Sequence, residues 1–471
     1  MIVETLGAIP DFRWGAATSA YQVEGAWNEG GRAESIWDVF CHSGRALSGV
    51  TGDVACDHYH NWQSDLGLVA QYGFNTYRFS ISWTRVFPFV NGKPTPNQEG
   101  IDFYKNILAE LQSRGITPMV TMFHWDLPKQ LDWRSPDVVD HFQDYAKFLL
   151  DTFPEVKLWI SVNEPFTFCL LGYHIGIHAP GVRSPYDHYK CGHHVLLAHA
   201  KTFDMFQKRF SSESGYKMGA VLNFDFPQPL DPTNPEDVQS VQANAVEQIG
   251  WFGDPLFFGD YPKELRLIAG DNLPNFTAAE KSLLLSGANH PMSFYGLNTY
   301  SGKYVSAPDH DPLHPFVQFW KDGKPIGERF ISSWLYGVPQ EILHHLRWVN
   351  NRYRPRQIYI TENGCSDPGR TQLEYTVNDW YRIAFFRDYL ANVAQAVKEG
   401  IPVQGYIVWS LMDNFEWADG YARRFGITYV DFQTQKRTPK LSAFWWLHLN
   451  ERMGVPSPTA ISGVDAAHVY K

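Results

Sequence analysis

Two glutamates of this chain occupy similar settings. Glu164 ends the segment LWISVNE and Glu362 lies in RQIYITENG, so each carboxylate follows directly on an apolar run. Two carboxyl groups that face one pocket can cleave a glycosidic bond, because one protonates the leaving oxygen while the other attacks the anomeric carbon or activates water. Each also has a structural interpretation: Glu164 could start a helix at Pro165, and Glu362 could be a loop acid beside a turn. Only a fold that brings the two together favours catalysis.

Other polar and aromatic side chains follow apolar runs in the same way. They are Gln22, Glu24, Arg78, His124, Asn163, Tyr300 and Trp409. Taken alone, a histidine or tryptophan in such a place is more often a satisfied core residue, and an arginine or tyrosine is a structural ion pair or a buried phenol. If the fold brings all of them together at one end of a barrel, we expect them to bind a substrate instead.

Eight short apolar runs with strand character recur along the chain, and longer amphipathic stretches lie between several of them. The runs cover residues 12–20, 75–83, 117–125, 158–164, 217–225, 292–300, 356–364 and 403–411. Two of the amphipathic stretches end at Gly115 and Gly400, as helices commonly do. The alternation predicts a single-domain (β/α)8 TIM barrel over residues 1–471, with its active site at the carboxyl ends of the strands. An open doubly wound sheet is disfavoured because no glycine-rich phosphate loop follows the first run.

The composition argues against several classes of function. A net charge of −10 without a basic stripe argues against a nucleic-acid partner, and no stretch approaches the length of a membrane helix. Five scattered cysteines and an N-terminus without signal-peptide character predict a reduced, cytoplasmic protein. The stretch HYKCGHHVLLAH has poor spacing for metal ligands, and we predict neither a metal nor a cofactor. The oligomeric state stays open.

Seven motifs carry a resemblance to a known family. They are FRWGAATSAYQVEG, YRFSISWTRVFP, HWDLP, SVNEP, YGLNTY, ITENG and WSLMDNFEWADGYARRFG, and they span residues 12 to about 445. In type and order they resemble glycoside hydrolase family 1, the β-glucosidase family. The resemblance implies a TIM-barrel hydrolase that retains the anomeric configuration of its substrate.

The resemblance also implies a role for each matching residue. Glu164 would be the general acid/base and Glu362 the nucleophile, contacted by Arg78 and Tyr300. The sugar would be bound by Gln22, His124, Asn163, Tyr300, Glu416 and Trp417, with Trp409 beneath its ring and Asn298 in a supporting position. Trp334, in ISSWLYG, is a candidate wall for the leaving group.

The expected activity is hydrolysis of terminal non-reducing β-D-glucosyl residues from cellobiose, short cello-oligosaccharides and aryl or alkyl glucosides, in the context of cellulose degradation. Transfer to alcohols or sugars is an expected side reaction, because a covalent glycosyl-enzyme forms. Glu416 disfavours a 6-phosphorylated sugar through like charge. Two alternatives stay open: an inactive homologue that binds sugars or a partner, and a preference for galactosides or fucosides.

Overall fold

Eight parallel strands close into a barrel at the centre of the molecule. The computed structural model describes residues 2–369 and 373–455. The barrel strands are β1 (Arg13–Ala17), β2 (Thr76–Ser80), β5 (Thr117–Phe123), β6 (Leu158–Asn163), β7 (Lys217–Asn223), β9 (Ser293–Asn298), β16 (Ile358–Asn363) and β17 (Val403–Trp409), hydrogen-bonded in that order. The ring closes where β1 pairs with β17, from Arg13 beside Gly405 to Ala17 beside Trp409. Each strand falls within one of the eight apolar runs, so the predicted barrel is confirmed.

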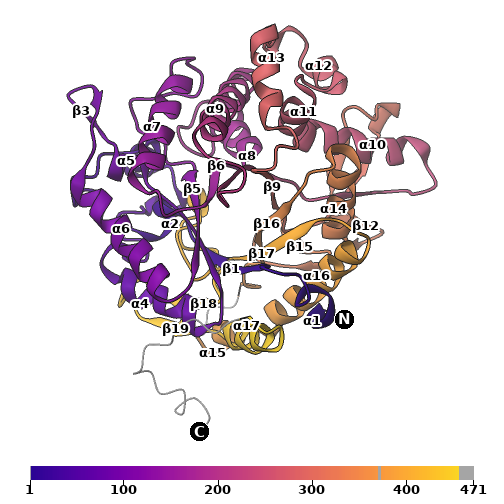
Figure 1. Ribbon diagram of the computed structural model, residues 1–471. Helices are drawn as coiled ribbons and strands as arrows, with labels where there is room; N and C mark the ends of the chain where they lie inside the picture. The colour runs from indigo at the N-terminus through magenta and orange to yellow at the C-terminus, as the bar shows by residue number, and fades with distance from the viewer. Residues whose placement is uncertain (1, 370–372, 456–471) are drawn as a thin grey trace.

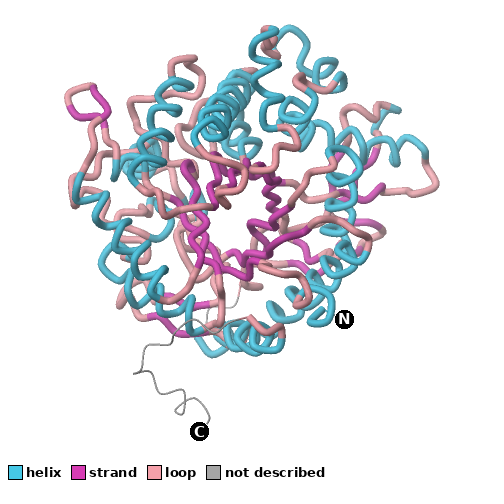
Figure 2. The backbone as a smooth tube through the Cα atoms, viewed as in Figure 1, coloured by secondary structure: helices cyan, strands magenta, loops and turns pink. Residues whose placement is uncertain are grey.

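Helices surround the barrel on all sides, as the cyan ring around the magenta strands in Figure 2 shows. They are α1 (Ile2–Leu6), α2 (Ala20–Val23), α3 (Ile36–His42), α4 (His58–Gln71), α5 (Trp83–Val86), α6 (Gln98–Ser113), α7 (Val138–Thr152), α8 (Pro165–Leu170), α9 (Asp187–Arg209), α10 (Pro235–Ala245), α11 (Trp251–Phe258), α12 (Lys263–Ala269), α13 (Ala278–Leu284), α14 (Gln340–Tyr353), α15 (Leu373–Val377), α16 (Trp380–Lys398) and α17 (Leu441–Arg452) (Figure 1). Just beyond α6 and α16, Gly115 and Gly400 adopt φ of 70° and 85°. This left-handed geometry favours glycine, which explains where both helices stop.

Parallel strands buried on both faces consist of apolar residues at nearly every position. All six residues of β6 and all six of β16 are buried. The core continues outward to the helices: the fully buried ring of Trp446 on α17 lies 6.2 Å from that of Trp14 on β1 and 5.2 Å from that of Phe386 on α16. The strands are therefore held from outside, and their carboxyl ends form a fixed frame.

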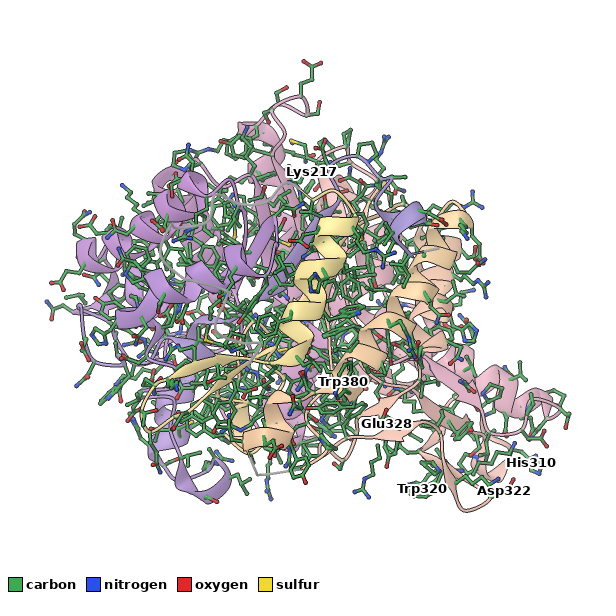
Figure 3. All side chains as sticks on the ribbon, turned by 90° about the horizontal axis from the view of Figure 1, so that it is seen from below. Lys217, His310, Trp320, Asp322, Glu328 and Trp380 are labelled. Atoms are coloured by element: carbon green, nitrogen blue, oxygen red, sulfur yellow. A yellow bond between two sulfur atoms is a disulfide. The ribbon has the colours of Figure 1, made fainter. Side chains whose placement is uncertain are left out.

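Further short strands lie outside the barrel. They are β3 (Phe89–Val90) with β4 (Lys93–Pro94), β8 (Pro227–Pro229) with β10 (Lys303–Ser306) and β11 (Phe316–Gln318), β12 (Trp320–Lys321) with β13 (Lys324–Pro325), β14 (Glu328–Arg329) with β15 (Tyr336–Gly337), and β18 (Thr428–Val430) with β19 (Arg437–Pro439). Figure 3 shows Trp320, Asp322 and Glu328 at the end of the molecule opposite Lys217, which begins β7. The segment from β10 to β15 therefore extends on the side where the barrel strands end.

A disulfide corrects the prediction of a wholly reduced chain. The packing of α8 against α9 brings the Cα atoms of Cys169 and Cys191 to 5.6 Å, and their sulfur atoms are bonded. Cys41, Cys56 and Cys365 are free and buried. In the described part of the chain, no helix has the length and apolar character needed to cross a membrane.

Candidate active site

Glu362 lies at the end of β16 with both carboxylate oxygens hydrogen-bonded. Arg78, from β2, donates through Nη1 to Oε1 at 2.5 Å, and the Tyr300 hydroxyl donates to Oε2 at 2.5 Å. Glu362 is 3% exposed, and Arg78 is 1% exposed. A buried guanidinium and a phenol stabilise negative charge on the carboxylate between them. Burial and the charge of Glu362 raise the pKa of Tyr300 well above its ordinary range, so this phenol stays a donor.

Glu164 is the first residue after β6 and adopts φ of 52°, in the left-handed region that few residues other than glycine occupy. Its amide donates to the carbonyl of Val221, which fixes this conformation. Although Glu164 precedes the first turn of α8, its side chain makes no cap hydrogen bond there. The structural interpretation as a helix start therefore does not account for the carboxyl group. Strained backbone of this kind is concentrated at functional sites.

The pKa of the Glu164 carboxyl is raised to about 8, first by burial and then by the negative charge of Glu362, while the hydrogen bond from Asn298 opposes the rise. Asn298 donates through Nδ2 to Glu164 Oε1 at 2.7 Å. At neutral pH Glu164 therefore keeps its proton and can act as an acid. Glu362, which accepts from Arg78 and Tyr300, is its charged partner.

A continuous set of hydrogen bonds joins the two glutamates. Arg78, which contacts Glu362, also donates through Nη2 to Asn163 Oδ1 at 2.7 Å. Asn298 donates to the same Asn163 oxygen at 3.2 Å and to Glu164. Both carboxyl groups therefore belong to one hydrogen-bonded polar cluster at the carboxyl ends of the strands, as the strand-end pattern of the sequence predicts.

The rings of His124, Trp409 and Trp417 lie together and form an aromatic side of the site. The His124 ring lies 5.9 Å from that of Trp409 and 6.0 Å from that of Trp417, nearly parallel to both. Burial and the charge of Arg78 lower the pKa of His124 well below its ordinary range, so the imidazole is neutral. Its Nε2 lies 3.2 Å from Asn163 Nδ2. Flat rings of this kind pack against the C–H face of a sugar.

Glu416 lies beside the Trp409 ring, and the backbone carbonyl of Gln22 accepts from the amide of Phe415, the residue before Glu416. The Trp409 indole donates to Glu416 Oε1 at 3.4 Å, and burial raises the pKa of Glu416 well above its ordinary range. Gln22 is fully buried, accepts from the Ser19 hydroxyl at 2.6 Å and donates to Asn414 at 3.1 Å. Its side chain is thus bonded within the protein, and its contact with a sugar stays a prediction.

Trp334 lies at the rim, with 41% of its surface exposed and its ring perpendicular to that of Tyr300 at 5.9 Å. This position fits the predicted wall for a leaving group. Glu24, in contrast, does not join the carboxylate pair. It forms a buried ion pair with Arg85 at 2.9 Å, which is a structural role.

Sequence reasoning missed one residue that supports the pocket. Asp225, the last residue of the fifth apolar run, accepts hydrogen bonds from the backbone amides of Tyr300 and Ser301, both at 2.9 Å. Its strand-end position was the available signal, but a carboxylate that binds only backbone amides belongs to no catalytic motif.

The histidine-rich segment of α9 has structural partners. The Nδ1 of His199 lies 2.6 Å from the Ser161 hydroxyl, the ring of His193 stacks on that of Phe276 at 4.5 Å, and Cys191 is in the disulfide. Among the residues that the structure describes, no three His, Cys, Asp or Glu side chains are grouped so that they could hold a metal ion.

Comparisons with known proteins agree with this geometry. The family model described as glycosyl hydrolase family 1 matches residues 8–455. The chain is 41% identical to Beta-glucosidase 42 of Arabidopsis thaliana over 458 residues, which cover 93% of this chain and 92% of that protein. It is 40% identical to Beta-glucosidase 4 of Oryza sativa subsp. japonica over 464 residues, covering 94% and 95%.

Solved structures superpose over almost the whole chain. A β-glucosidase from the fungus Humicola insolens in complex with glucose matches with a TM-score of 0.89 and 39% identity, covering 94% of this chain and 98% of that one. A mutant of a rice β-glucosidase in a covalent complex with Glc matches with a TM-score of 0.89 and 36% identity, over the same shares of the two chains.

Proposed function

We infer that this chain, which belongs to glycosyl hydrolase family 1 and is a β-glucosidase, removes terminal non-reducing β-D-glucosyl residues by double displacement. Cellobiose, short cello-oligosaccharides and aryl or alkyl glucosides are the proposed substrates. The observation that carries the inference is the pair of buried glutamates, one protonated and one charged, joined through Arg78, Asn163 and Asn298.

In the first proposed step, a carboxylate oxygen of Glu362 forms a bond to the anomeric carbon. The glycosidic bond breaks as the proton of Glu164 passes to the leaving oxygen. The product is a glucosyl ester on Glu362, and Glu164 is left as a carboxylate. Since the pKa of Glu164 is raised to about 8, its proton is present at neutral pH for this step.

In the second step, Glu164 takes a proton from water, and the water oxygen attacks the anomeric carbon. The ester bond breaks, Glu362 regains its negative charge, and glucose leaves with its original configuration. Because the ester carries no charge, one cause of the raised pKa of Glu164 is absent in the intermediate, and Glu164 can work as a base. An alcohol or a second sugar in place of water would give transglycosylation.

The pocket supports an unphosphorylated sugar. Glu416 is a buried carboxyl group whose oxygens accept hydrogen bonds from hydroxyl groups in either protonation state. It offers no positive charge to a phosphate. The neutral His124 can likewise exchange hydrogen bonds with hydroxyl groups, since one ring nitrogen of a neutral imidazole donates and the other accepts.

The test is turnover of p-nitrophenyl β-D-glucoside, with the first-formed anomer followed by NMR. We expect β-glucose from the wild-type enzyme and a loss on the order of 10⁴-fold or more in Glu362→Ala, with the melting temperature as a control for folding. Turnover that survives this substitution, or an α-anomer as first product, would contradict the proposal. Relative kcat/KM values for glucosides, galactosides, fucosides and cello-oligosaccharides rank the substrates, and those for cellobiose test the proposed role in cellulose degradation.

The cytoplasmic location stays a prediction. The Cys169–Cys191 disulfide weighs against it, because disulfides persist mainly in oxidising compartments. Cell fractionation, with thiol labelling of the two cysteines before and after reduction, tests both points.

A further inference from the structure

The segment that follows β9, residues 299–302, carries Tyr300 into the active site but has no regular secondary structure of its own until β10 begins at Lys303. Such a segment depends on specific hydrogen bonds for its shape. At its start, the amide of Thr299 donates to the carbonyl of Glu362, and the Thr299 hydroxyl lies within hydrogen-bond distance of the buried carboxyl of Glu341.

The middle of the segment is held by one carboxylate oxygen. Oδ1 of Asp225 accepts from the consecutive amides of Tyr300 and Ser301, both at 2.9 Å. Asp225 follows β7, the strand that pairs with β9, so it is anchored to the barrel rather than to the segment that it holds. Two consecutive amides that point at one oxygen have very little freedom to reorient.

Tyr300 and Ser301 each connect Asp225 to a different part of the active site. The Tyr300 hydroxyl donates to Glu362 at 2.5 Å. The Ser301 hydroxyl donates to the carbonyl of Trp334 at 2.8 Å and accepts from the amide of Tyr336 at 2.9 Å, which holds the loop that presents the Trp334 ring. The Asp225 carboxylate is thus connected both to the nucleophile, through Tyr300, and to the rim of the site, through Ser301.

We propose that Asp225 is a positioning residue that aligns both the phenol on the nucleophile, through Tyr300, and the leaving-group wall, through Ser301 and Trp334. The inference rests on the proposed function of Glu362 and deepens it. A misplacement of about 1 Å at a reacting group can cost on the order of 100-fold in rate, so a carboxylate connected in this way affects catalysis without touching the substrate.

Besides the two amides, a buried lysine and a buried glutamate lie near Asp225. Lys303, on β10, is buried, and its pKa is lowered to about 8, mainly by burial; its positive charge acts on Asp225. Burial and then the charge of Asp225 raise the pKa of Glu341, on α14, well above its ordinary range. Lys303 Nζ is directed at Gln248 at 3.4 Å. The two amides therefore supply the hydrogen bonds of Asp225 Oδ1, and their loss is the effect that a substitution measures.

The experiment compares Asp225→Ala, Asp225→Asn and the matched control Asp237→Ala on p-nitrophenyl β-glucoside and cellobiose. Asp237, on α10, is also a buried aspartate that accepts two backbone amides, those of Asp231 and Ala307, and neither of these partners is a residue of the active site. We expect Asp225→Ala to lower kcat about tenfold or more and to raise KM for cellobiose. Asp225→Asn retains an acceptor oxygen and should recover most of both values, and Asp237→Ala should change neither.

Double-mutant cycles separate positioning from a general loss of structure. In a Tyr300→Phe background, Asp225→Ala should lower kcat less than about twofold further, because it acts through the same phenol. Ser301→Ala should reproduce the change in KM for cellobiose without the loss of kcat. If Asp225→Ala does not fold, Asp225→Ser replaces it, since the serine side chain is too short to reach both amides.

Full additivity with Tyr300→Phe, or kinetics of Asp225→Ala that equal those of Asp237→Ala, would overturn the proposal. Failure of the proposed function gives a different result, namely turnover that survives Glu362→Ala, and that measurement comes first. The two failures are therefore distinguishable.

Discussion

Replacement of Glu362 by glutamine should lower the pKa of Glu164. The substitution keeps the shape of the side chain and one of the two oxygens that accept from Arg78 and Tyr300, but it removes the negative charge. That charge disfavours ionisation of Glu164. In the variant, the charge of Arg78 also loses its partner and then favours the ionised form of Glu164, so both changes act in the same direction.

The size of the fall follows from the causes of the raised pKa. Two unit charges about 5 Å apart, the spacing that a retaining mechanism uses, interact by about 3 kcal/mol at an effective dielectric constant of about 20, which is about 2 pKa units. The pKa of Glu164 is raised from 4.5 to about 8, and burial is the larger of the two causes that raise it, so the charge of Glu362 supplies less than half of their combined upward effect. We expect a fall of about 1 to 2 units, to a value still above that of an ordinary glutamate.

The assay is a pH titration of protein labelled with ¹³C at the glutamate side-chain carboxyl carbon. The resonance of Glu164 is the one that disappears in Glu164→Gln. Glu341→Gln, which removes a buried carboxyl outside the pair, serves as control and should leave this titration in place. An unchanged midpoint in Glu362→Gln would show that the two carboxyl groups do not interact, and a fall to the ordinary value would show that burial contributes nothing.

Three further outcomes follow from the structure. In the wild-type enzyme, kcat/KM for cellobiose should decline as pH rises through about 8, because Glu164 then loses its proton. A dinitrophenyl glucoside has a leaving group that needs no acid, so its kcat/KM should not show this decline. Identical pH profiles for both substrates would argue against Glu164 as the acid. Gly364→Ala should abolish activity and lower the melting temperature, since its Cβ would lie 1.9 Å from the carbonyl oxygen of Trp409; an active, equally stable variant would mean that the strand ends can separate. The double substitution Cys169→Ser and Cys191→Ser should reduce the free energy of unfolding by about 3 kcal/mol, because the disulfide closes a loop over a separation of 22 residues. A denaturant unfolding curve that matches that of the wild type would refute this.

The barrel could be predicted from the sequence because strands buried on both faces are rich in apolar residues. Each such run also extended past its strand to the polar residue that follows, such as Glu164 after β6. The carboxyl ends of parallel strands meet, so the candidate site followed from the same pattern.

Other features depend on tertiary packing, which a local sequence pattern does not predict. The contact of α8 with α9, and not the spacing of the cysteines, brings Cys169 to Cys191. The role of Asp225 depends on the path of a segment 75 positions further along the chain. Gln22 was predicted from its motif, yet its buried amide already has partners in Ser19 and Asn414.

The pairing of β1 with β17 has a consequence for synthesis of the protein. Gly405 lies beside Arg13, and β17 is the last barrel strand in the sequence, so the first strand meets its second neighbour only after the other seven strands have been made. Until then the growing chain presents an unpaired strand edge, which is prone to join with other chains. The ring can therefore close only after the last of the eight barrel strands has left the ribosome, and a premature stop codon upstream of β17 leaves an open sheet without Trp409.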